Sequence, residues 1–204
     1  MVHKIYQANK VNGEWKEIKE IGLCPKYASA LHPTISEDGK RLFFASNMPG
    51  SYGDYDIYVA NIRNDGSFGR VKNLGDKINT KRNELYPNLA NNSTLFFASE
   101  GHEGEGGLDI YVAQVDKKVV GYAMNLGSKI NSKEDDFSIS LETNDRMGYV
   151  MSNRGRNIET IQQVAFTYNT NTLDDNDNKR MYDFAEINES DSKTDYTSNL
   201  YEDE

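Results

Sequence analysis

The sequence predicts an all-β fold made of recurring four-stranded units, and three observations support this prediction. A block of 53 residues recurs along the chain. Each copy divides into four short segments of strand character, which turn residues such as Asp-Gly and Asn-Asn separate. The composition also favours half-buried pleated surfaces, because 13 Tyr and 8 Phe occur without long aliphatic runs.

Three anchor segments define the repeat and fix its register. Their copies lie at 41–46, 94–99 and, in weaker form, 147–152 (RLFFAS, TLFFAS, MGYVMS), at 56–60 and 109–113 (DIYVA in both), and at 73–79 and 125–131 (NLGDKIN, NLGSKIN). Units of this length form arrays in which each unit buries its apolar faces only against its neighbours. The repeat therefore predicts a β-propeller whose blades are four-stranded antiparallel sheets.

The repeat divides the chain into about three to four blades and a tail. In the first full blade, strands a to d are expected at 32–35, 41–46, 56–62 and 68–74. The predicted units are a partial blade at 5–22, full blades at 29–75 and 82–127, a partial blade at 133–168 and an acidic, largely irregular tail at 169–204.

This number of blades is low for a closed propeller, so three arrangements stay open. The N-terminal strand pair could close a small ring with the C-terminal strands. The chain could instead be a truncated or partial propeller, which is the arrangement we favour. Thirdly, open blade edges could support self-association.

The net charge of −9 is distributed unevenly. Residues 169–204 hold 11 acidic and 3 basic residues, which leaves 21 acidic and 20 basic residues in the rest of the chain. We expect no nucleic-acid partner, because such partners require a basic surface. No segment is apolar for long enough to span a membrane, and the N-terminus has no signal-peptide pattern, so an exported form would carry its signal upstream or have lost it.

The anchors resemble a known propeller family. Residues 36–47 and 53–59 are similar to the TolB-type, WD-like repeat. Residues 106–112, with the Asn-Leu-Gly and Lys-Ile-Asn that follow, resemble the propeller region of OmpA-family envelope proteins of Bacteroidota. The likeness covers about residues 5–152 and ends after Ser152, where no glycine-rich run leads into Asp-Ile-Tyr-Val.

The resemblance implies a bacterial envelope protein, periplasmic or associated with the outer membrane. It implies a protein-binding or scaffolding module whose partner is an envelope protein or peptide. The given sequence holds no OmpA-like domain, so peptidoglycan binding does not carry over from the family.

No motif in the sequence predicts catalysis, and we expect no catalytic residue, no cofactor and no metal site. A Gly-x-Ser-x-Gly elbow is missing. The glycine-rich run at 101–107 lacks the lysine and helix of a phosphate-binding loop, and we interpret it as a flexible connection. His3, His32 and His102 do not have the spacing of zinc ligands.

A ligand is expected on the face where the b–c and d–a loops emerge, because loops on a rigid scaffold usually carry binding. Solvated loop residues without a ligand are the plainer interpretation of this face. Asp56 and Asp109, at the start of strand c, are expected to order the turn by accepting backbone N–H bonds. The candidate ligand-binding residues are Tyr52, Asp54, Tyr55, His102, Glu103, Glu105, Arg154 and Arg156.

Two alternatives to a protein-binding module stay open. The first is a lectin-like propeller that binds a glycan, in which exposed aromatic rings stack on sugars. The second is the accessory propeller of a hydrolase whose catalytic domain lies on another chain.

Overall fold

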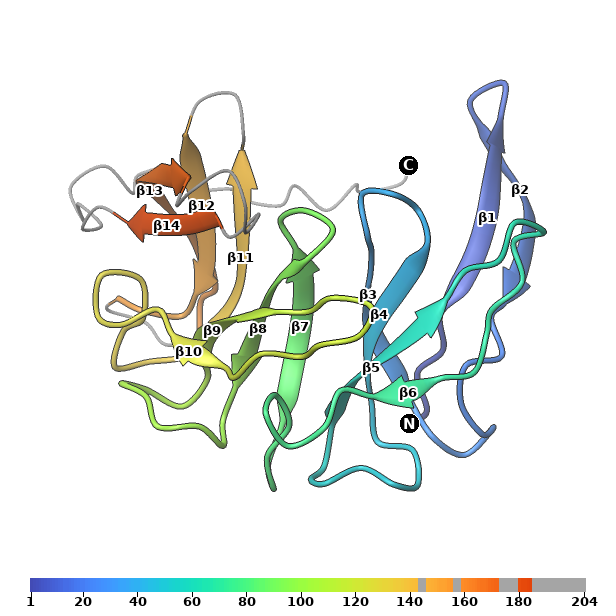
Figure 1. Ribbon diagram of the computed structural model, residues 1–204, viewed down its shortest axis with the longest axis horizontal. Coiled ribbons are helices and arrows are strands. Elements are labelled where there is room, and N and C mark those ends of the chain that lie inside the picture. The colour runs from blue at the N-terminus through green and yellow to red at the C-terminus, as the bar shows by residue number, and fades with distance from the viewer. Residues whose placement is uncertain (143–145, 156–158, 173–179, 185–204) are drawn as a thin grey trace, which may run out of the picture.

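The computed structural model describes residues 1–142, 146–155, 159–172 and 180–184, and every regular element in them is a β-strand. These strands form three four-stranded antiparallel sheets and one two-stranded hairpin (Figure 1). Within each sheet the strands pair in chain order, so that each sheet is a meander. This architecture confirms the predicted all-β propeller class.

The chain forms a half-blade followed by three blades. The half-blade consists of β1 (Tyr6–Val11) and β2 (Glu14–Glu20). Blade 1 consists of β3 (Ala30–Ile35), β4 (Arg41–Ser46), β5 (Asp56–Asn61) and β6 (Lys72–Asn73). Blade 2 consists of β7 (Glu84–Leu89), β8 (Thr94–Ser99), β9 (Asp109–Gln114) and β10 (Met124–Asn125), and blade 3 of β11 (Asp136–Glu142), β12 (Met147–Ser152), β13 (Gln162–Thr172) and β14 (Arg180–Phe184).

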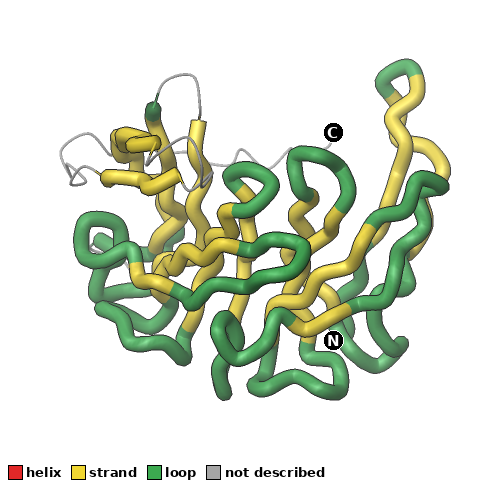
Figure 2. The backbone as a smooth tube through the Cα atoms, in the orientation of Figure 1, coloured by secondary structure: helices red, strands yellow, loops and turns green. Residues whose placement is uncertain are grey.

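The units follow one another along an open arc. The half-blade lies at one end of the arc and blade 3 at the other (Figure 1). The a–b turns lie along the upper edge in this view, and the long b–c and d–a loops lie along the lower edge (Figure 2). The described strands of the half-blade and of blade 3 lie apart, at opposite ends of this arc (Figure 1). The ring that the N-terminal pair could have closed with the C-terminal strands is therefore not formed.

Each apolar core lies between two neighbouring units. Adjacent residues of a strand point to opposite faces of the sheet, which explains the two consecutive phenylalanines in strand b of blade 1 and of blade 2. Phe44 packs toward the half-blade, whereas Phe43 packs toward blade 2. In blade 2, Phe97 packs back against blade 1 and Phe96 against blade 3. All four rings are at most 1% exposed, so each blade depends on its neighbours for burial.

An asparagine clasp joins each d–a connection to strand c of the same blade. In blade 1, Asn79 accepts a hydrogen bond from Ile57 N–H at 2.8 Å and donates Nδ2 to Ile57 O at 3.1 Å and to Asn73 Oδ1 at 2.8 Å. Gly75, with φ of +87°, reverses the chain between the two asparagines. The third anchor segment of the repeat is therefore a structural device that returns the chain to strand c.

Blade 2 repeats this clasp at the equivalent positions. Asn131 accepts from Ile110 N–H at 2.8 Å and donates to Ile110 O at 3.0 Å and to Asn125 Oδ1 at 2.9 Å. Ile78 and Ile130, which precede the two clasp asparagines, are both 0% exposed. Each clasp thus also fixes an aliphatic side chain in the core between two blades.

Strand a of blade 1 and strand a of blade 2 touch through an aromatic pair. His32 and Tyr86 both have positive φ, at +50° and +51°, and their rings stack at 3.9 Å. Burial lowers the pKa of His32 to about 4. The imidazole is therefore neutral near pH 7, and its Nδ1 accepts a hydrogen bond from Tyr86 N–H at 3.3 Å.

Two boundaries differ from the sequence prediction by more than two residues, whereas strand a of blade 1 begins two residues earlier than expected and strand c ends one residue earlier. Strand d of blade 1 was expected at 68–74, but only Lys72–Asn73 join the ladder, because the chain near Phe68 makes just an isolated bridge to Ile62. Blade 3 was expected to be partial and to end at residue 168. It has four strands, since β13 continues to Thr172 and pairs with β14.

Strand β14 lies within the segment that was predicted to be the acidic tail. The repeat comparison missed it because residues 180–184 carry none of the Asn-Leu-Gly signature that marks strand d elsewhere. Residues 173–179 and 185–204 of the predicted tail lie outside the described part of the chain.

We predict that replacing Asn79 with alanine lowers the free energy of unfolding by about 1 to 3 kcal/mol, because Ile57 N–H then loses its buried acceptor, whereas Ile57 O keeps the hydrogen bond from Leu74 N–H. Urea titration followed by fluorescence measures this change. Asn64, exposed in the c–d turn of blade 1, is the control, and Asn64→Ala should change stability by less than about 0.5 kcal/mol. Equal unfolding midpoints for the two variants would contradict the proposed role of the clasp.

Candidate functional site

The aspartate at the start of strand c orders the b–c loop, as the sequence predicted. In blade 1, Asp56 accepts hydrogen bonds from Tyr52 N–H at 2.8 Å and from Gly53 N–H at 3.2 Å. In blade 2, Asp109 accepts from Gly106 N–H at 3.1 Å, and burial raises the pKa of its carboxyl. Both aspartates are buried, so these carboxylates hold loop backbone.

The b–c loops also pack closely against the next d–a connection. A Cβ at Gly53 would lie 2.2 Å from Arg82 O, and one at the equivalent Gly106 would lie 2.0 Å from Glu134 O. Only glycine allows backbones to approach this closely. The glycine-rich run at 101–107, which we interpreted as a flexible connection, thus owes at least part of its composition to close packing.

Four of the predicted ligand-binding residues are exposed on the loop edge, namely Tyr52, Asp54, Glu103 and Glu105, and Tyr55 is half-buried. The main chain of this group is partly engaged: Tyr55 O accepts from Glu84 N–H, and Glu103 O accepts from the hydroxyl of Tyr111. Within the described residues, no hydrogen bond or ion pair joins one predicted side chain to another. These five residues remain a prediction of a ligand site.

The side chains of His102 and Arg154 are committed to internal contacts. His102 Nε2 lies 2.8 Å from Ile78 O, and its ring packs 5.0 Å from that of Tyr111. Arg154 forms an ion pair with Asp136, whose side chain is fully buried. The charge of Arg154 is therefore matched within blade 3. Arg156, the eighth predicted residue, lies outside the described residues.

A buried glutamate links the d–a connection between blades 1 and 2 to the end of strand b of blade 2. Glu84, at the start of β7, accepts hydrogen bonds from Thr80 N–H at 2.8 Å, Thr80 Oγ1 at 2.6 Å and Ser99 Oγ at 2.8 Å. Its side chain is 0% exposed. Burial raises the pKa of Glu84 to about 7 despite these hydrogen bonds.

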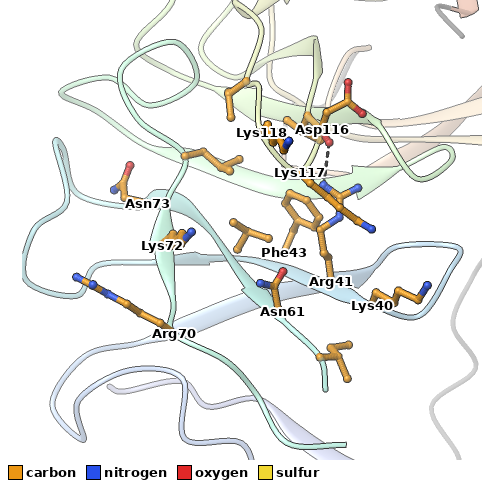
Figure 3. A pocket seen from close by; sticks show the side chains of 15 residues that line it. Lys40, Arg41, Phe43, Asn61, Arg70, Lys72, Asn73, Asp116, Lys117 and Lys118 are labelled. Atoms are coloured by element: carbon orange, nitrogen blue, oxygen red, sulfur yellow. Dashed lines mark hydrogen bonds between the residues drawn. The ribbon is translucent and has the colours of Figure 1, made fainter. Parts of the chain in front are cut away.

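A pocket lies away from the loop edge, between blades 1 and 2. Its volume is about 440 Å³. Blade 1 supplies the starts of strands b and d and the end of strand c, and the c–d turn of blade 2 closes the other side (Figure 3). Six basic side chains and one acidic side chain line it, namely Lys40, Arg41, Arg70, Lys72, Lys117, Lys118 and Asp116.

Arg41 is the deepest of these cations. It is 7% exposed, and its guanidinium lies 5.3 Å from the ring of Phe43. Nη1 donates to Val115 O at 2.9 Å and Nη2 donates to Asn92 O, while the buried Nε has no hydrogen-bond partner. Figure 3 shows the bond to the Val115 carbonyl across the pocket. Among the described residues, none of the ion pairs found involves Arg41.

None of the six basic residues was among the predicted ligand-binding residues, because that prediction rested on the loop edge and on features that the repeats share. The signal lay in the differences between repeats. Lys40 and Arg41 stand where blade 2 has Ser93 and Thr94, in the same register as the RLFFAS and TLFFAS anchors.

The comparisons with known proteins identify no family. No family model matches the chain, and no curated protein matches it. One solved structure with a similar chain is a puromycin-hydrolyzing peptidase of Mycobacterium tuberculosis, at 17% sequence identity and a TM-score of 0.47. The similarity covers 73% of this chain and 22% of the peptidase chain.

Two kinds of feature are absent from the described residues. No helix in them is long and apolar enough to cross a membrane. They also contain no group of three or more His, Cys, Asp or Glu side chains placed to hold a metal ion.

We predict that Glu84 makes stability fall as pH rises from 4.5 to about 7, because the folded chain binds this proton more tightly than the unfolded chain. The stabilisation by Glu84 is complete below the pKa that this residue has in the unfolded chain. It is lost as pH rises through the pKa that the residue has in the folded chain. In urea unfolding at pH 4.5 and pH 8, wild type should lose about 3 kcal/mol relative to Glu84→Gln. Parallel pH profiles of the two proteins would refute the raised pKa.

Proposed function

We propose that this chain is a non-catalytic protein-binding or scaffolding module of the bacterial cell envelope. One observation carries the proposal: the half-blade exposes residues that the full blades bury. Tyr6 is 60% exposed, whereas its repeat equivalents Tyr58 and Tyr111 are 4% and 2% exposed. The two buried tyrosines lie in strand c, where Tyr58 packs in the core shared with the half-blade and Tyr111 in the core shared with blade 1.

The half-blade has the strands equivalent to c and d but none equivalent to a and b. In the described structure β1 pairs only with β2, so its other edge is available for a further strand. Peptides commonly bind by adding a strand to such an edge. Val11, Trp15 and Ile18 are also exposed on this hairpin, and exposed apolar groups of this kind typically mark protein contacts.

The half-blade suits a protein partner better than a sugar. Sugar binding of the lectin type needs an open aromatic face, but the Lys10 ammonium lies over one face of the Trp15 ring, 5.5 Å from the ring centre. The envelope setting, periplasmic or at the outer membrane, is supported by the resemblance of the repeat to OmpA-family propellers of Bacteroidota.

We predict that Tyr6→Ala and Ile18→Ala each reduce partner capture from a bacterial envelope extract about tenfold or more, as loss of one interface anchor would. Immobilised protein and quantitative mass spectrometry of the retained proteins measure this. Ile161→Ala removes another exposed isoleucine, 55% exposed against 67% for Ile18, from blade 3 and should leave capture unchanged. Identical profiles for all variants would reject the proposal, and a glycan-array signal without protein capture would favour the lectin alternative.

A further inference from the structure

The pocket between blades 1 and 2 contains a buried charge, that of Arg41, for which the described residues form no ion pair. Arginine is rarely buried without an anionic partner, because removing a charge from water is costly. Arg41 donates to two main-chain carbonyls and keeps a free Nε, and none of the ion pairs found in the described chain includes it. An anionic group that enters the pocket would supply the missing charge.

The exposed acid nearest in sequence, Asp38, is engaged elsewhere. Its Oδ1 accepts hydrogen bonds from Ser36 Oγ at 2.6 Å and from Lys40 N–H at 3.1 Å. These bonds are the main reason that the pKa of Asp38 is lowered, and Arg41 contributes least. Asp38 therefore orders the a–b turn.

The basic residues of the pocket are not required by the blade fold. The repeat register places Ser93, Thr94, Tyr122 and Met124 of blade 2 at the positions of Lys40, Arg41, Arg70 and Lys72 of blade 1. Lys117 and Lys118 in turn stand where the c–d turn of blade 1 has Asn64 and Asp65. Blade 1 carries one set at these positions and blade 2 the other, so the gathering of cations at this one interface calls for another explanation.

The floor of the pocket is aliphatic. Val59, Leu74, Val115 and Val120 line it together with Phe43. Phe43 is the one aromatic residue of the lining, and at 1% exposure it offers no face on which a nucleobase or sugar could stack. An aliphatic floor below a cationic rim fits a ligand that carries an apolar group beside its negative charges.

We propose that this pocket binds an acidic peptide segment, in which a carboxylate pairs with Arg41 and an adjacent aliphatic side chain lies on the floor. Arginine forms charge-assisted hydrogen bonds with carboxylates, and Arg41 is the most buried cation of the pocket lining. The lysines of the rim attract the other carboxylates of the segment. The site is separate from the half-blade, so it adds a second surface to the proposed module.

The test uses the full chain and a fluorescein-labelled octapeptide of alternating glutamate and leucine, with binding followed by fluorescence anisotropy. Lys117→Gln/Lys118→Gln should weaken binding about tenfold, which corresponds to about 1.4 kcal/mol. Lys81→Gln/Lys133→Gln removes the same charge from exposed positions outside the pocket and should leave the affinity within about twofold.

Arg41→Gln should abolish binding, and its urea midpoint shows whether the variant is folded. The lysine pair, on an exposed turn, keeps the test decisive if Arg41→Gln unfolds. A matched peptide of glutamine and leucine, and one of glutamate and serine, should both bind more weakly than the glutamate–leucine peptide.

Three results would overturn the proposal: equal affinities for the two lysine variants, equal affinities for the three peptides, or competition by inorganic phosphate or heparin as strong as that by the acidic peptide. The last result would assign the pocket to a phosphate or a polyanionic glycan. Tyr6→Ala should bind the octapeptide like wild type, so failure at the half-blade and failure at the pocket are distinguishable.

Discussion

The structure depends on the asparagine clasp. It fastens the chain that follows strand d to strand c of the same blade, before the next blade begins. Asn79 and Asn131 accept the N–H of Ile57 and of Ile110 with a side-chain oxygen, and they share the carbonyls of these two residues with the main-chain N–H of Leu74 and of Leu126. The clasp sets the place from which the next blade begins. Because a sheet exposed on both faces cannot be stable alone, this placement decides whether the apolar faces of neighbouring blades meet.

Both proposed binding surfaces arise where this array is incomplete or irregular. The half-blade buries only one of its two faces: Ile5 is buried against blade 1, while the adjacent Tyr6 stays exposed. The pocket forms at the interface of blades 1 and 2, where Arg41 occupies a position that a threonine fills in blade 2. The blades thus provide a rigid support, and departures from the repeat provide chemistry.

The sequence predicted the repeated part of the fold well, because equivalent residues carry equivalent packing. Both limits of strand b were correct in blade 1, where the paired phenylalanines mark it, and the role of Asp56 followed from its place at a turn. Strand β14 was missed because it carries no anchor. The role of Arg154 was also missed, since its ion pair with Asp136 joins residues that only the folded blade brings together.

Native-state hydrogen exchange at Ile57 and Ile110 measures how firmly the clasp holds each blade, since these amides donate to the clasp side chains and not to a backbone carbonyl. The clasp account predicts that both exchange only through global unfolding, with the same free energy as amides of the central strand β4. Exchange of Ile57 and Ile110 at rates typical of an open loop, while β4 stays protected, would contradict it.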